Sequence, residues 1–126
     1  MDRGEAEALA RQWVAAWNDR DVEAVLAHYT DDVVVVSPLA TARGVAADGK
    51  VRGKDAVRAY YEGGLAARPR LRFTIYNVMV GVDGLTIVYR DERGRQVAET
   101  LVLGGGRAVR VMAHYGPEPA DAGWQR

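Results

Sequence analysis

The chain has 126 residues and a mass of 13.8 kDa, which fits one domain, since typical domains hold roughly 100–150 residues. Its 17 Lys and Arg balance 17 Asp and Glu, and no apolar run is long enough to cross a membrane, so we expect a soluble, cytoplasmic protein without a nucleic-acid or membrane partner. With no cysteine and only two histidines, the chain cannot form disulfides or Cys-based metal sites, and we expect neither a metal site nor a cofactor.

The first part of the chain predicts two helices. Apolar residues recur every third or fourth position over residues 6–17, which is the pattern of an amphipathic helix with one face in the core. Trp13 and Trp17 both lie on that face. A second stripe of the same kind covers residues 22–29, and we expect the polar residues 30–32 to end that helix.

The middle of the chain predicts a strand, a loop and a third helix. The β-branched run Val33–Val36 is typical of a buried strand, which ends at Ser37 and the proline after it. Residues 39–53 follow neither the helical nor the strand period and contain three glycines, so we expect a loop over one end of the domain. From Lys54 a short helix carries Tyr61, and its two adjacent glycines should weaken its end.

The second half predicts four consecutive strands joined by Asp-Gly or Gly-rich turns, which are antiparallel hairpins. Helices first and a β-meander afterwards give an α+β fold, in which a curved antiparallel sheet packs against the N-terminal helices. We expect one domain over residues 1–126, with irregular tails at 1–4 and 117–126. The predicted strands cover residues 71–82, 85–91, 96–103 and 108–115.

Three motifs occur together: Trp13–Asp21, His28–Val33 and Gly53–Tyr61. In combination they resemble the nuclear-transport-factor-like superfamily, particularly its SnoaL-like and ketosteroid-isomerase-like branch. The resemblance implies a cone-shaped domain with an apolar pocket between helices and sheet, commonly dimeric through the outer face of the sheet. It does not identify the chemistry, because this fold hosts isomerases, cyclases, hydrolases, ligand binders and interaction modules.

Glu99 is the strongest candidate for chemistry. Strand alternation places it on the same face as Val97 and Leu101, and a carboxyl among apolar side chains should have a raised pKa and act as an acid or base near neutral pH. The resemblance implies that Glu99 stands at the position of the protonated aspartic acid in the oxyanion hole of ketosteroid isomerase. The alternative is an ion pair with Arg90 or Arg110, or exposure at an end of the sheet.

Two positions depart from the isomerase pattern. Trp13 stands where the resemblance implies an oxyanion-hole tyrosine, and an indole donates one hydrogen bond but does not ionise. Ser37 stands where it implies the general-base aspartate, and a serine hydroxyl without a partner base cannot abstract a carbon-bound proton at neutral pH. We therefore do not expect steroid isomerisation by that mechanism. Tyr61 matches a pocket tyrosine of the family, with plain core packing as the alternative.

The outer face of the last two strands should form a two-fold dimer. Apolar residues on an exposed sheet face need cover, and a self-complementary face supplies it in a homodimer. His114 lies on this face, so we interpret it as an interface or solvated residue. The predicted dimer face carries Thr100, Val102, Met112 and His114.

Two functions remain open at this point. The chain is either a cofactor-independent isomerase, cyclase or hydrolase that transfers a proton through Glu99, or a non-catalytic ligand-binding or dimerisation module of the same fold. The serine at position 37, where the resemblance implies a general-base aspartate, favours the non-catalytic module. The carboxyl of Glu99 on an apolar strand face favours the enzyme. In both cases the expected ligand is a small hydrophobic molecule. Its pocket is predicted to be lined by Trp13, Trp17, Ser37, Tyr61, Tyr89 and Tyr115.

Overall fold

The computed structural model describes residues 1–119 and begins with helix α1 (Arg3–Asn18). Asp2 caps this helix by accepting a hydrogen bond from the backbone nitrogen of Glu5 at 2.8 Å. The helix therefore starts inside the segment predicted as an irregular tail, and only residues 1 and 2 precede it. Both tryptophans of α1 are buried, as the apolar stripe predicts. Within residues 1–119 no helix is long and apolar enough to span a membrane.

The second helix is shorter than the sequence predicts. Helix α2 (Val22–Leu26) ends at Leu26, and strand β1 (Tyr29–Val36) starts three residues later. Tyr29 is thus a strand residue that pairs with Ala108, and the backbone nitrogen of Ala108 donates to the carbonyl of His28 at 2.7 Å. Sheet pairing prevails over the helical spacing at this point, because tertiary contacts override a weak local preference. The polar residues 30–32 consequently lie in the strand.

Residues 39–53 contain two short elements instead of the predicted loop. Helix α3 (Pro38–Ala42) starts with proline and is capped by Ser37, whose hydroxyl accepts from the backbone nitrogen of Leu39 at 3.2 Å. Strand β2 (Lys50–Arg52) then pairs antiparallel with β1. Elements of five and three residues are too short to show a period in the sequence.

Helix α4 (Lys54–Ala67) runs through Gly63 and Gly64 and does not end there. Its apolar face continues past the glycines, since Leu65 is as buried as Tyr61. Burial of that face therefore outweighs the low helix propensity of two glycines.

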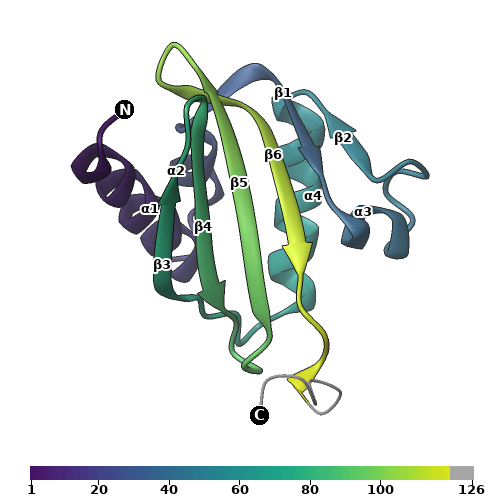
Figure 1. The fold of residues 1–126 in the computed structure, drawn as a ribbon. Coiled ribbons are helices and arrows are strands. Elements are labelled where there is room, and N and C mark those ends of the chain that lie inside the picture. Colours follow the sequence, from purple (N-terminus) through teal and green to yellow (C-terminus); the bar gives the residue numbers. More distant parts are fainter. Residues whose placement is uncertain (120–126) are drawn as a thin grey trace.

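The four remaining strands form the predicted antiparallel meander, and the α+β fold is confirmed. The sheet has the order β2-β1-β6-β5-β4-β3, and β1 runs parallel to β6, so the complete sheet is mixed where a purely antiparallel one was predicted. The parallel pair arises because β1 enters the sheet beside the last strand of the chain (Figure 1). The meander strands are β3 (Thr74–Val80), β4 (Gly84–Arg90), β5 (Gln96–Gly104) and β6 (Arg107–Tyr115).

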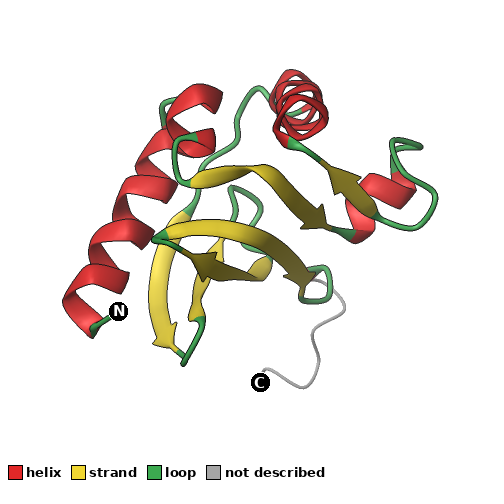
Figure 2. Ribbon diagram, turned by 90° about the horizontal axis from the view of Figure 1, so that it is seen from above, coloured by secondary structure: helices red, strands yellow, loops and turns green. Residues whose placement is uncertain are grey.

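The helices leave part of the sheet uncovered. Figure 2 shows α1 and α4 on the same side of the curved sheet. Helix α1 packs on β3 and β4, whereas α4 packs on β1 and β2 at the other end of the strand order. The middle strands β5 and β6 therefore face the space between the two helices. Residues 116–118 have no regular structure, and the predicted tail from 120 to 126 lies outside the described residues.

Candidate functional site

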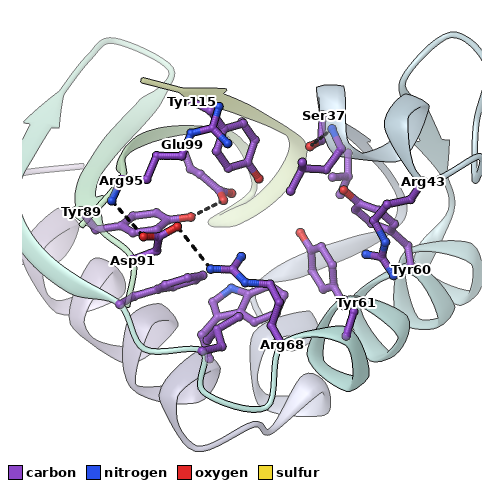
Figure 3. A pocket seen from close by; sticks show the side chains of 18 of the residues that line it. Ser37, Arg43, Tyr60, Tyr61, Arg68, Tyr89, Asp91, Arg95, Glu99 and Tyr115 are labelled. Carbon is purple, nitrogen blue, oxygen red and sulfur yellow. Dashed lines mark hydrogen bonds and ion pairs between the residues drawn. The ribbon is translucent and has the colours of Figure 1, made fainter. Parts of the chain in front are cut away.

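A cavity of about 260 Å³ lies between the helices and the inner face of the sheet (Figure 3). Pockets for drug-sized ligands hold roughly 300–1,000 Å³, so this cavity suits a small molecule. Six of its lining side chains are aromatic, and four more are arginines. Its lining includes Trp17, Ser37, Arg43, Tyr60, Tyr61, Arg68, Phe73, Tyr89, Asp91, Arg93, Arg95, Glu99 and Tyr115.

Glu99 projects into this cavity from the middle of β5. Glu99 is only 8% exposed, and the hydroxyl of Tyr89 donates a hydrogen bond to Oε1 of Glu99 at 2.7 Å. The alternative ion pairs are not formed: within residues 1–119 Glu99 has no cationic partner, and the guanidinium of Arg90 lies 5.5 Å from the ring of Tyr76. Strand alternation explains this, because Arg90 points to the opposite face from Tyr89.

Burial determines the protonation of Glu99. Removal from water disfavours the charged carboxylate and raises the pKa of Glu99 to about 7, although the hydrogen bond from Tyr89 acts in the opposite direction. Near neutral pH both forms of the carboxyl are therefore populated. The same side chain can donate a proton in one form and accept one in the other.

The hydroxyl of Tyr61 is oriented by a buried chain of hydrogen bonds. The indole Nε1 of Trp13 donates to the hydroxyl of Tyr29 at 3.0 Å, and that hydroxyl lies 2.8 Å from the hydroxyl of Tyr61. Because an indole can only donate, Tyr29 uses an oxygen lone pair for Trp13 and can satisfy its own buried proton by donating to Tyr61. The proton of Tyr61 is then available to a ligand in the cavity.

The tyrosines around Glu99 stay protonated. Burial raises the pKa of Tyr61, Tyr89 and Tyr115, and the nearby Glu99 carboxyl raises each of them further. A hydrogen bond with the Ser37 hydroxyl lowers the pKa of Tyr115 and so opposes the effect of burial. These hydroxyls therefore offer hydrogen bonds from neutral donors.

The structure places Trp13 outside the cavity lining, although it was predicted to be part of it. Its side chain is completely buried behind the cavity wall, where its ring lies 6.4 Å from Phe73 and 5.9 Å from Tyr89. The helical stripe shows that a residue faces inward but does not distinguish a cavity wall from the packing behind it. Trp17, one turn further on, does line the cavity and packs edge-on against Tyr61 at 4.6 Å.

The lining of this one cavity also contains arginines that the sequence analysis did not single out. The predicted site residues found in the same lining are Trp17, Ser37, Tyr61, Tyr89, Glu99 and Tyr115. Arg68 bridges the cavity wall by ion pairs to Asp91 at 3.3 Å and Glu92 at 2.8 Å. Arg95 donates to the carbonyl of Gly116 at 2.7 Å. Arg68 follows helix α4, whereas Arg95 lies in the hairpin between β4 and β5, so the two arginines are distant in the sequence. Each segment, considered alone, has the pattern of charged residues exposed to solvent.

No metal site accompanies the cavity in the part of the chain that is described. Within residues 1–119 no three His, Asp or Glu side chains come together in an arrangement that could hold a metal ion. The chemistry available to the described lining is that of hydrogen bonding, proton transfer and charge recognition.

Comparisons with known proteins agree with this architecture. A family model described as a SnoaL-like domain matches residues 10–117. A SnoaL-like protein of unknown function from Burkholderia thailandensis is 34% identical, with a TM-score of 0.87, and the match covers 93% of this chain and 99% of that chain. No curated protein matches the sequence.

Two further solved structures share the fold at lower identity. TerC, crystallised with polyporic acid, is 16% identical with a TM-score of 0.73, over 89% of this chain and 92% of that chain. AclR from Streptomyces galilaeus, for which a hydroxylase activity has been suggested, is 24% identical with a TM-score of 0.72, over 94% of this chain and 80% of that chain.

Proposed function

The chain belongs to the SnoaL-like family of the nuclear-transport-factor-like superfamily, and on this premise we propose that its cavity binds a small hydrophobic molecule bearing a carbonyl or hydroxyl group, to or from which Glu99 transfers a proton. The observation that carries the proposal is the buried Glu99 carboxyl, which faces an aromatic cavity and has no cation beside it in the described chain. A group of this kind is poised for acid–base chemistry near neutral pH.

Glu99 would act on the ligand together with two neighbouring tyrosines, Tyr61 and Tyr89. In its protonated form Glu99 can donate a hydrogen bond to a carbonyl oxygen of the ligand, and Tyr61 supplies a second neutral donor within the same cavity. In its ionised form Glu99 can accept a proton from a C–H or O–H group of the ligand. Tyr89 holds the carboxyl in position through its 2.7 Å hydrogen bond, so Tyr89 is a positioning residue.

Ser37 is an unsuitable nucleophile or base. Its hydroxyl accepts from the backbone nitrogen of Leu39 as the cap of α3, and the histidine that would activate a serine is missing from the cavity lining. Steroid isomerisation through a base at this position is therefore not part of the proposal. Support for a small-molecule ligand comes from the fold: TerC was crystallised with polyporic acid, and a hydroxylase activity has been suggested for AclR.

A non-catalytic ligand-binding module is the alternative function. The observation in its favour is Ser37, which stands where the resemblance implies the family's general base. Among the described lining residues, Glu99 is then the carboxyl without an ion-pair partner. In this case the same hydrogen bonds would hold a ligand without transforming it.

Proton transfer can be tested with 2-tetralone, a small hydrophobic ketone that has exchangeable C–H protons beside its carbonyl. The protein should accelerate deuterium incorporation into 2-tetralone in D₂O, as followed by NMR. Glu99→Gln should abolish the acceleration and retain ligand-induced thermal stabilisation, whereas Glu62→Gln, an exposed change on α4, should behave like the wild type. Binding without acceleration in the wild type would favour the non-catalytic module.

We further propose that the protein forms a homodimer through the outer face of the sheet. The side chains of Thr100, Val102 and Met112 are half-buried there, and His114 is exposed. Met79 on β3 is 52% exposed on the same sheet and adds apolar surface that a second copy would cover.

A further inference from the structure

We propose that Arg43 makes the cavity select ligands that carry an anionic oxygen group, such as a carboxylate, at the end opposite Glu99. The inference rests on the proposed ligand-binding function of the cavity and names the class of ligand. Arg43 lies in the segment that was predicted as a loop over one end of the domain, and no role was predicted for it.

The guanidinium of Arg43 has a built seat on helix α4. Its central carbon lies 5.4 Å from the ring centroid of Tyr60, within the range of a cation–π contact. A Cβ atom on Gly63 would lie 2.9 Å from Nη2 of Arg43, and one on Gly64 would lie 3.1 Å from Nη1. The two glycines therefore leave the space that the guanidinium occupies.

This seat costs helix stability. A glycine inside a helix is less favourable than alanine, and α4 contains two in succession where its apolar face continues unbroken. The glycines accommodate no turn and no positive φ angle, since α4 passes through both in helical conformation. The space beside both glycines is occupied by the end of the Arg43 side chain.

Arg43 has no anionic partner of its own within residues 1–119. Arg68 is neutralised by Asp91 and Glu92, and Arg95 has Glu118 at 3.4 Å. The side chain of Arg43 forms neither an ion pair nor a hydrogen bond with any described residue, and its contact with the ring of Tyr60 leaves the N–H groups free. A planar guanidinium with free N–H groups beside an apolar cavity is the geometry that binds a carboxylate through paired hydrogen bonds.

The charges around the cavity point the same way. Four arginines line it, and two of them, Arg68 and Arg95, are paired with carboxylates. Arg43 is one of the lining arginines that have no carboxylate partner within residues 1–119. Figure 3 shows Arg43 and Glu99 on opposite sides of the cavity, with the rings of Tyr60 and Tyr61 on the Arg43 side. A flat ligand can place its anionic end at Arg43 and its reacting end at Glu99.

The test compares 2-naphthoate with its neutral counterpart 2-naphthamide by calorimetry. Wild type should prefer the naphthoate by roughly tenfold or more, as a charge-assisted pair implies. Arg43→Gln should remove most of that preference through weaker naphthoate binding, with naphthamide binding unchanged. Arg93→Gln removes the same charge from an exposed turn at the rim and should keep most of the preference.

Gly63→Ala tests the seat without changing any charge. The added methyl group should displace the Arg43 guanidinium and reduce the preference for naphthoate, while the higher helix propensity of alanine keeps the melting temperature at or above that of the wild type. Gly63 lies outside the cavity lining, so the added methyl group acts on the ligand through Arg43 and not by direct contact.

The outcomes separate the two proposals. If wild type binds both probes equally, or if Arg43→Gln and Arg93→Gln lose the same share of the preference, the selective role of Arg43 is overturned and the ligand-binding function stands. An unchanged preference in Gly63→Ala overturns the role of the seat. If neither probe binds to wild type, the proposed ligand-binding function fails, and the inference fails with it.

Discussion

Replacing Glu99 by glutamine should stabilise the protein at pH 8 much more than at pH 5. Burial raises the pKa of Glu99 to about 7, whereas the ordinary value of 4.5 applies to the unfolded chain. Each pH unit between two such values corresponds to about 1.4 kcal/mol, so ionising Glu99 in the native state costs about 3 kcal/mol in total. Glutamine keeps an oxygen that can accept the hydrogen bond from Tyr89 and carries no charge to desolvate.

The direction of this pH dependence follows from how many protons Glu99 binds in the folded and unfolded chain. Between pH 4.5 and pH 7 native Glu99 holds a proton that the unfolded chain releases, so its contribution to stability falls as the pH rises and becomes constant above pH 7. Most of this loss lies between pH 5 and pH 8. The free energy of unfolding of Glu99→Gln, minus that of wild type, should therefore increase by about 2–3 kcal/mol over this interval.

Urea unfolding at the two pH values measures this difference, with Glu62→Gln as the exposed control. Burial lowers the pKa of His28, so His28 adds stability as the pH rises. That contribution is present in every variant and cancels in the comparison. Parallel pH dependences for wild type and Glu99→Gln would refute the reasoning, because they would mean that Glu99 ionises equally well in the folded and unfolded chain.

Three further outcomes follow from the structure. Asn18→Ala should lower the free energy of unfolding by about 1–3 kcal/mol in urea titrations, because the Asn18 side chain pairs with both backbone groups of Phe73 at 2.8 and 2.9 Å; an unchanged midpoint would count against this. Gly84→Ala should leave little folded protein by circular dichroism, since the added Cβ would lie 1.9 Å from the carbonyl oxygen of Leu101, and normal folding would show that β4 and β5 are not so close. Sedimentation should give twice 13.8 kDa for wild type and 13.8 kDa for Val102→Arg, and a monomeric wild type at high concentration would contradict the proposed dimer face.

Strand alternation was the most informative signal in the sequence. It placed Glu99 and Tyr89 on the inner face of their strands, and the register Ile87↔Glu99 and Tyr89↔Val97 brings both to the same cavity. These positions were predictable because an antiparallel hairpin with a short turn leaves one register that buries the apolar face.

Features that depend on contacts between distant segments were not predictable. Tyr29 continues a helical stripe in the sequence, yet its pairing with Ala108, 79 positions further along the chain, makes it a strand residue (108 − 29). The parallel pairing of β1 with β6 has no local signal for the same reason. Trp13 and Trp17 share one stripe, and which tryptophan reaches the cavity depends on tertiary packing, since Phe73 contacts both rings and Tyr89 packs against Trp13.

The role of Arg43 in the cavity lining was not predictable from the sequence for a related reason. Arg43 follows a five-residue helix that has no sequence period, and its seat is formed by two glycines that, by propensity alone, favour a helix end. Only the approach of α3 to α4 gives these three residues a common role.

The central claim is that Glu99 is a proton-transfer group near neutral pH, and NMR titration of its ¹³C-labelled side-chain carboxyl tests it most directly. The midpoint should lie at about 7 in wild type. It should move higher in Tyr89→Phe, because the hydrogen bond that favours the carboxylate is then lost. A midpoint at or below the ordinary value of 4.5 would contradict the claim, since Glu99 would then be permanently ionised at neutral pH.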